Sequence, residues 1–287
     1  MEMLTILLLL PLGFILWAYT SATVAATFPK LRNKRICLLI AHPDDEAMFF
    51  SPTLLALTKE EFGNHIKILC LSNGDADHLG HIRKHELTKS ALRLGLRSET
   101  DVLVLEDPHF PDSMQKEWDR YAIAALLSSA FAPNNTQGAG AQPTATIDTL
   151  ITFDDYGISQ HPNHRSLYHG AKTFLLDLMK GKTGWECPVQ LYTLTSVSIL
   201  RKYTGIMDAT LTMLEGVFSG GHSEAKTAKG KRLERLVFVN GMTEYGSAWG
   251  AMTKAHVSQM RWFRWGWISL GRYMFVNDLR KEKVAAS

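Results

Sequence analysis

Cysteine is scarce in this sequence. Among 287 residues there are three cysteines, Cys37, Cys70 and Cys187, which lie far apart, form no Cys-x-x-Cys pair and in two cases sit inside apolar runs. This usage argues against a disulfide framework and is typical of buried thiols in a reducing compartment.

A strong charge of one sign is also missing. The chain carries 31 Lys and Arg against 28 Asp and Glu, a formal net charge of +3 that is spread evenly along the sequence. So small an excess gives no indication of a nucleic acid partner, and we expect none. We find no internal repeat.

Charged residues are absent from residues 4–27. An uncharged, mostly apolar stretch of this kind matches the ~20 residues that a helix needs to cross a bilayer. The residues before it include Glu2 and no Lys or Arg, so the basic n-region of a cleaved signal peptide is missing. A cleaved signal remains the alternative, since residues 22–26 are small enough to suit a peptidase.

Basic residues follow the apolar stretch at Lys30, Arg32, Lys34 and Arg35. By the positive-inside tendency this places the body of the protein in the cytoplasm. We therefore expect a single-pass transmembrane anchor over residues 1–29 and a cytoplasmic catalytic domain over residues 30–287.

After the anchor, short apolar runs alternate with longer segments of helical period. Strands are predicted at residues 36–41, 66–71, 102–105, 150–153, 190–194 and 236–239, and helices at residues 52–62, 82–94, 118–131 and 164–179. Buried strands that alternate with helices indicate an α/β fold, here a Rossmann-like, mostly parallel sheet with helices on both faces.

Three polar loops follow predicted strands. AHPDDE (residues 41–46) follows the first strand, SNGD (residues 72–75) the second and DDYG (residues 154–157) the fourth. Ligands of such folds bind beyond the carboxyl ends of the strands, so we expect these loops at one functional edge. So much charge at the tip of a buried strand is costly unless a metal, a substrate or solvent compensates it.

Two histidine motifs can hold a metal ion there. In HPDD (residues 42–45), His42 and Asp45 are three apart in a tight turn, and HPNH (residues 161–164) brings His161 and His164 to the same edge. His42, Asp45 and His164 would supply two nitrogens and one oxygen and leave a fourth position for water, as a catalytic zinc site requires. Asp44 stays beside them as a carboxylate that can take a proton from that water.

Other interpretations remain open at this point. A His-Pro-Asp turn on its own is more often a solvated turn. Two histidines and one carboxylate also make the ligand set of non-haem Fe(II) oxygenases, although Asp44 would then have no task. A catalytically idle membrane scaffold is a further class, against which the intact ligand set argues.

The two motifs together resemble the LmbE-like family of zinc-dependent N-deacetylases. Within that family, AHPDDEAMFFSPT (residues 41–53), TFD (residues 152–154) and HVSQMRWFR (residues 256–264) resemble the eukaryotic members that act on a glycolipid. The resemblance covers about residues 35–277. It implies removal of acetate from N-acetylglucosaminyl-phosphatidylinositol, the second step of glycosylphosphatidylinositol (GPI) anchor assembly, on the cytoplasmic face of the endoplasmic reticulum membrane. Another N-acetyl sugar or thiol conjugate is the alternative substrate.

The resemblance also implies roles for individual residues. Carried over, it makes His42, Asp45 and His164 ligands of Zn²⁺, although Mn²⁺, Fe²⁺ or Co²⁺ can occupy the same set. Asp44 becomes the general base, and His161 stabilises the oxyanion or protonates the departing amine.

Further positions are expected to bind the substrate, namely Arg83, Glu86, Asp154 and His256. Arg83 and Glu86 lie three apart on one predicted helix, where a plain surface ion pair is the alternative. His256 belongs to the HVSQMRWFR run.

Tryptophans and arginines alternate over residues 262–275. Amphipathic rings and cations suit the membrane interface, so we expect this C-terminal segment to be interfacial. An aromatic helix of the core is the alternative.

Overall fold

The structure is a computed structural model that describes residues 2–134, 141–220 and 234–283. Its strands form one sheet in the order β3-β2-β1-β4-β5-β7-β6. Their bounds are β1 (Arg35–Ile40), β2 (His65–Cys70), β3 (Val102–Val104), β4 (Thr149–Phe153), β5 (Gln190–Leu194), β6 (Arg235–Val239) and β7 (Val276–Lys281). The first five are parallel, whereas β7 runs antiparallel to both β5 and β6.

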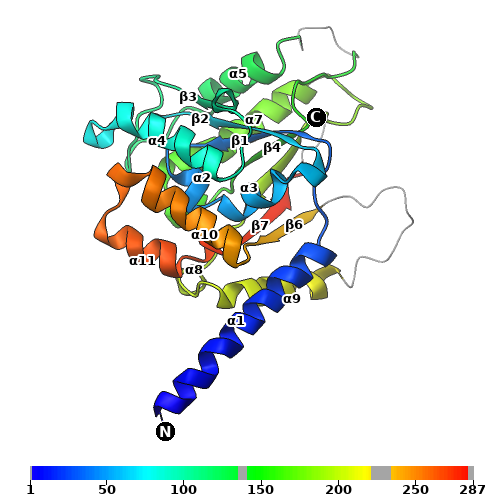
Figure 1. The fold of residues 1–287 in the computed structure, drawn as a ribbon. Coiled ribbons are helices and arrows are strands. Elements are labelled where there is room, and N and C mark those ends of the chain that lie inside the picture. Colours follow the sequence, from blue (N-terminus) through cyan, green and yellow to red (C-terminus); the bar gives the residue numbers. More distant parts are fainter. Residues whose placement is uncertain (1, 135–140, 221–233, 284–287) are drawn as a thin grey trace.

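The α-helices occupy most of the remaining described chain. They are α1 (Glu2–Thr27), α2 (Asp45–Met48), α3 (Ser51–Leu57), α4 (Gly80–Arg93), α5 (Arg120–Phe131), α6 (Gly157–Gln160), α7 (Pro162–Met179), α8 (Ile199–Lys202), α9 (Met207–Gly220), α10 (Met242–Gly250) and α11 (Trp262–Leu270). Figure 1 shows α5 and α7 together in one layer, with α3, α4 and α10 in the layer across the sheet. The predicted α/β architecture with a mostly parallel sheet and helices on both faces is confirmed.

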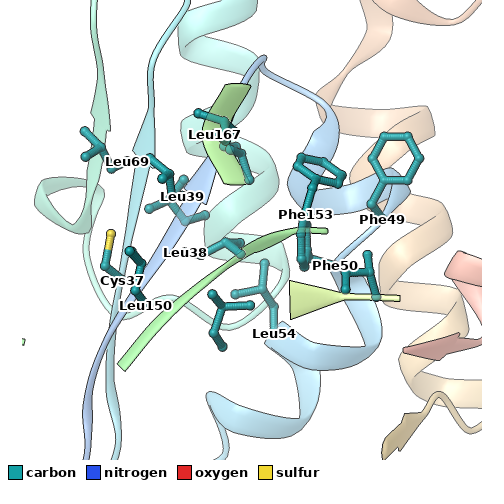
Figure 2. Close-up of a cluster of buried hydrophobic side chains, with 14 of the residues drawn as sticks. Cys37, Leu38, Leu39, Phe49, Phe50, Leu54, Leu69, Leu150, Phe153 and Leu167 are labelled. Atoms are coloured by element: carbon teal, nitrogen blue, oxygen red, sulfur yellow. The ribbon is translucent and has the colours of Figure 1, made fainter. Parts of the chain in front are cut away.

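The centre of the sheet is apolar for a simple reason. A strand covered by helices on both faces has no solvated side, so β1 reads RICLLI and buries every residue after Arg35. Side chains of β1, β4 and α3 interlock there with Phe49 and Phe153 (Figure 2). Cys37 and Cys70 belong to this core, whereas Cys187 is only partly buried, and all three thiols are free.

All six predicted strands are present, but β7 was not predicted. Its sequence, VNDLRK, places Asn277 and Asp278 in buried positions. The Asn277 amide donates to the Phe49 carbonyl at 2.7 Å, and Asp278 pairs with Arg235 at 2.7 Å. Because polar residues occupy its inward positions, the strand lacks the apolar pattern by which strands are recognised in a sequence.

The N-terminal helix α1 meets the body at its second half and projects away from it at its first (Figure 1). Trp17 is buried there, and its indole donates to the Asn240 carbonyl at 2.6 Å. Within the part of the chain whose side chains the structure describes, which begins at Pro11, no helix is long and apolar enough to span a membrane. The transmembrane helix expected over residues 1–29 finds no support in that part.

Candidate active site

The two histidine motifs meet at a switch point of the sheet. β1 and β4 are neighbours and parallel, yet the chain leaves β1 toward β2 on one side and leaves β4 toward β5 on the other. A crevice opens between the carboxyl ends of two such strands. HPDD directly follows β1, and HPNH follows β4 after a short loop. The expectation that these loops share one edge is confirmed.

The turn after β1 is built around Asp45. Its Oδ2 accepts hydrogen bonds from the backbone N–H groups of Ala41 at 2.9 Å and His42 at 3.0 Å. Asp44, which lies between His42 and Asp45 in the turn, has φ of 124°, a backbone conformation that non-glycine residues rarely adopt. Strain of this kind persists where the surrounding structure imposes it, which is common at functional sites.

The second motif is fixed by the start of α7. Pro162 occupies the first turn of the helix, where a missing N–H costs nothing. His161 caps the helix, since its Nδ1 accepts from the Asn163 N–H at 3.2 Å. The His164 ring stacks on Phe153 with centroids 3.8 Å apart, and the His161 ring stacks on His164 in turn. Both imidazoles are thereby held at the edge where β4 ends.

The three predicted metal ligands come together. His42, Asp45 and His164 are all buried, and each offers a ligand atom within 4.8 Å of the others. Two imidazole nitrogens and one carboxylate oxygen are a donor set that a divalent transition metal accepts.

The hydrogen bonds around His164 show that a cation fits this set. Its Nδ1 donates to the Gly157 carbonyl at 2.9 Å, because a carbonyl can only accept, so Nε2 of the neutral ring carries a lone pair. That Nε2 is buried, makes no hydrogen bond and lies 3.2 Å from Asp45 Oδ1. A lone pair facing a carboxylate oxygen is satisfied by a positive ion between them. The orienting carbonyl is the usual support of a histidine ligand.

The charges of the cluster act on one another. Burial by itself raises the pKa of the Asp45 carboxyl, but His164 and His42 together outweigh it and lower that pKa below its usual value. Burial, followed by the neighbouring His164 and His42, lowers the pKa of His161 to about 3. His161 is therefore a neutral imidazole near pH 7. Since its Nδ1 accepts a hydrogen bond, its Nε2 carries the proton and can donate it to a substrate oxygen.

Asp44 is buried, and two guanidinium groups compensate its charge. Arg264 of α11 contacts its Oδ2 directly, and Arg83 of α4 lies 3.6 Å from the same oxygen. Arg83 is itself fixed by the carbonyls of Gly74 at 2.6 Å and Pro43 at 2.9 Å. The spare carboxylate predicted from the sequence is thus held beside the cluster without being one of its ligands.

Asp112 is a site residue that sequence reasoning missed. Its carboxylate lies 3.3 Å from His42 Nε2 and 3.1 Å from Arg83 Nη1. With His42 and His161 it forms a second group able to hold a metal ion. The sequence does not single it out, because the loop that follows the third strand carries several acids, among them Glu106, Asp107 and Asp112.

Arg83 and Glu86 do not form the surface ion pair that their spacing allows. Glu86 is buried and accepts from the Ser258 N–H at 2.8 Å, the Ser258 hydroxyl at 2.7 Å and the Gln259 amide at 3.3 Å. Its partners therefore belong to the HVSQMRWFR run. Of these two residues, only Arg83 contacts the acids of the site, Asp44 and Asp112.

His256 contacts the HPDDE turn through Glu46. Its side chain is fully buried, with Nε2 2.6 Å from Glu46 and Nδ1 2.6 Å from Gln259. Glu46 also accepts from the Asp44 N–H at 3.1 Å and binds the Ser90 hydroxyl. These contacts join the HVSQMRWFR run to the HPDDE turn and support the strained backbone of Asp44.

Asp154 shapes the loop that carries HPNH. Its two oxygens accept from the Ser196 N–H and hydroxyl, each at 2.6 Å, and from the Gly157 N–H at 3.0 Å. The same Gly157 supplies the carbonyl that orients His164.

A groove of about 420 Å³ opens next to Asp112. Polar side chains from the loops after β2 and β3 line it, among them Ser72, Asn73, Asp75 and Glu106. Hydroxyl, amide and carboxylate groups suit a ligand that carries several hydroxyls. A second cavity of about 220 Å³ lies between α1 and the end of β6, away from the cluster.

Comparison with known proteins agrees with this geometry. A family model described as PIG-L, GlcNAc-PI de-N-acetylase, matches residues 37–175. An N-acetylglucosaminyl-phosphatidylinositol de-N-acetylase of Arthroderma benhamiae is 52% identical, over 94% of this chain and 95% of its own. The protein of that name from Saccharomyces cerevisiae is 34% identical, over 90% of this chain and 85% of its own.

Among solved structures, the N,N'-diacetylchitobiose deacetylase of Pyrococcus horikoshii has a TM-score of 0.45 and 15% identity, and the match covers 87% of this chain and 84% of that one. The sequence relationships confirm the resemblance that AHPDDE and HPNH indicated, and with it a hydrolase that removes acetyl groups. This chain belongs to the PIG-L family of de-N-acetylases.

Proposed function

We propose that this protein removes acetate from N-acetylglucosaminyl-phosphatidylinositol in the assembly of GPI anchors. The observation that carries the proposal is the buried set of His42, Asp45 and His164 with the unligated carboxylate of Asp44 beside it. Relatives with that activity in their names cover nearly the whole chain.

We propose Zn²⁺ as the resident ion of this set, since two imidazoles and one carboxylate with an open fourth position are a common catalytic zinc site. Mn²⁺, Fe²⁺ or Co²⁺ fit the same donors. When bound, a divalent ion supplies the charge that polarises an amide carbonyl and lowers the pKa of a water molecule.

The remaining steps fall to side chains of the chain. Asp44, held by Arg83 and Arg264, accepts the proton of the attacking water. His161, neutral near pH 7, donates from Nε2 to the oxygen that becomes negative in the tetrahedral state. When the C–N bond breaks, the proton on Asp44 is available to the departing amine, and acetate is released.

The other predicted substrate-binding residues divide into two groups in this proposal. Arg83 pairs with Asp112, which lines the groove, and is assigned to the substrate. Glu86, Asp154 and His256 have their side-chain atoms occupied by other parts of the protein, so we assign them to positioning.

We further propose that residues 1–29 anchor the chain in the endoplasmic reticulum membrane, with a catalytic domain of residues 30–287 on the cytoplasmic side. Residues 4–27 carry no charge, and α1 is one helix from Glu2 to Thr27. The basic cluster that follows favours the cytoplasmic placement.

The test is acetate release by the detergent-solubilised full chain, measured with N-acetylglucosaminyl-phosphatidylinositol and with a water-soluble N-acetylglucosamine conjugate. We expect release from the glycolipid, its loss after chelation and its return with added Zn²⁺. Comparable turnover of the soluble conjugate would favour another acetylated substrate. No release from either by metal-replete protein would contradict the proposal.

A further inference from the structure

α9 exposes large apolar side chains, which is unusual for a helix next to water. Its inward face carries Asp208 and Thr212 beside the apolar Ala209 and Met213, all four buried. Its outward positions Met207, Leu211, Leu214 and Phe218 recur at helical spacing and are exposed, Phe218 to 73%. On the surface of a soluble body, the outward side of a helix normally carries polar side chains.

Ion pairs stabilise the polar groups on the inward face. Asp208 meets Arg272 at 2.6 Å and Arg201 at 2.6 Å, and the Arg272 guanidinium donates to the Thr212 hydroxyl at 3.0 Å. The buried charge of α9, Asp208, therefore has its partners on the inward side, and the outward stripe is left apolar.

α8 extends the exposed apolar surface. Ile199 and Leu200, at its start, are exposed to 78% and 77%. Only a few residues separate α8 from α9, and both lie at the side of the body from which α1 projects (Figure 1). We call this surface the α8–α9 ridge; it comprises Ile199, Leu200, Met207, Leu211, Leu214 and Phe218.

The ridge is continuous with the apolar surface of α1. The two helices touch through Thr20 and Thr210, whose hydroxyls are 3.0 Å apart, and through Val24 against Ala209. On the part of α1 nearer its N-terminus the exposed side chains are again large and apolar, namely Leu12, Phe14, Ile15, Leu16 and Tyr19. Contiguous exposed apolar surface of this extent marks a binding face.

The charge beside the ridge fits a phospholipid surface. Lys202 ends α8, and its ammonium contacts the Ser159 hydroxyl and lies 5.0 Å from the Trp267 ring. It forms no ion pair with any residue that the structure describes. Ser159 precedes the HPNH motif, so this cation lies between the apolar ridge and the catalytic edge. An ammonium next to apolar side chains matches the phosphate level above a bilayer.

We infer that the α8–α9 ridge inserts into the lipid bilayer beside α1 and presents the catalytic edge to the membrane surface. The choice of lipid over a protein occupant rests in part on the proposed glycolipid substrate. The inference adds a second membrane contact, independent of residues 1–29, that fixes how the body is oriented.

The test uses the full chain with Cys187 replaced by serine and one new cysteine carrying an environment-sensitive fluorophore. Ile199→Cys and Leu214→Cys report on the ridge. Leu176→Cys is the control, because it is an exposed leucine of α7, which lies beside α5 away from α9 in Figure 1. Labelled protein is bound to phosphatidylcholine–phosphatidylinositol vesicles with and without an acyl-chain nitroxide.

We expect the nitroxide to remove most of the fluorescence at positions 199 and 214 and to leave position 176 unchanged. Ridge labels that stay open to aqueous iodide on the vesicles would overturn the inference. The inference would also be overturned by ridge labels that are shielded from iodide in native microsomes but are not quenched by the nitroxide in vesicles. That pattern indicates a protein partner. Acetate release by the same preparation in detergent tests the proposed function separately, because it does not depend on vesicle contact.

Discussion

At the carboxyl ends of β1 and β4 the chain buries two imidazoles and two carboxylates, whereas along α8 and α9 it exposes leucine, isoleucine and phenylalanine. In the first region the unfavourable burial is compensated by fixed partners, such as the guanidinium groups at Asp44 and the backbone N–H groups at Asp45. In the second region nothing among the described residues covers the apolar side chains. Both regions depart from the usual sorting of polar and apolar groups, and such departures are expected where function overrides stability.

The two regions should also respond differently to substitution. If the catalytic edge is a preorganised polar site, single substitutions there should affect rate by orders of magnitude. If the ridge side is a membrane contact, substitutions there should affect only encounters with lipid.

The largest effect is expected from Asp44→Asn. Replacing the carboxylate by an amide removes the proton acceptor while keeping its size, so acetate release should fall on the order of 10²–10⁴-fold. Asp155→Asn, an exposed acid after β4, is the matched control and should keep full activity. An Asp44→Asn protein as active as wild type would remove Asp44 from the mechanism.

His256→Ala sharpens the distinction between catalysis and support. Because the imidazole is fully buried between Glu46 and Gln259, its loss leaves those groups without a partner. The free energy of unfolding should fall by about 1–3 kcal/mol, as measured by denaturant titration. His169→Ala, on the exposed side of α7, should change it by less than about 0.5 kcal/mol. Unchanged stability of the His256 variant would argue for a direct role with substrate instead.

Lys202→Ala tests the boundary between the two regions. One cation near an anionic surface contributes about 1 kcal/mol, so the apparent KM for substrate in vesicles should rise about fivefold with little change in kcat. Lys180→Ala, an exposed lysine after α7, should leave KM unchanged. A fall in kcat with constant KM would assign Lys202 to the chemistry.

The smallest effect is expected from the thiols. Burial raises the pKa of Cys37 to about 12 and raises that of Cys70 as well, so neither forms a reactive thiolate near pH 7–8. Burial raises the pKa of Cys187 too, but this thiol is only partly buried, so it alone should react with a water-soluble disulfide reagent in the folded protein. Cys187→Ser should leave activity unchanged. Rapid modification of Cys37 or Cys70 before denaturation would show that the core opens.

Much of the catalytic edge could be predicted from the sequence, because its signals are local. His42 and Asp45 share one turn, His161 and His164 share another, and each turn ends an apolar strand. Parallel strands that end at one edge then bring the two turns together.

The contributions from distant loops could not be predicted in the same way. Asp112 and the contact of Arg264 with Asp44 come from loops and helices whose approach to the site depends on packing. β7 was missed because Asn277 and Asp278 are buried, and the outward apolar stripe of α9 was missed because the burial of Asp208 depends on Arg272. A sequence shows which residues alternate but not which side of a helix meets the body.

The most direct test of the proposed metal site is the metal content of three purified proteins, measured together with their acetate release. We expect a stoichiometric divalent metal ion in the wild type, its loss in His164→Ala and its retention in Asp44→Asn, with acetate release lost in both variants. A His164→Ala protein that retains both metal and activity would show that the cluster of His42, Asp45 and His164 is not the centre of the reaction.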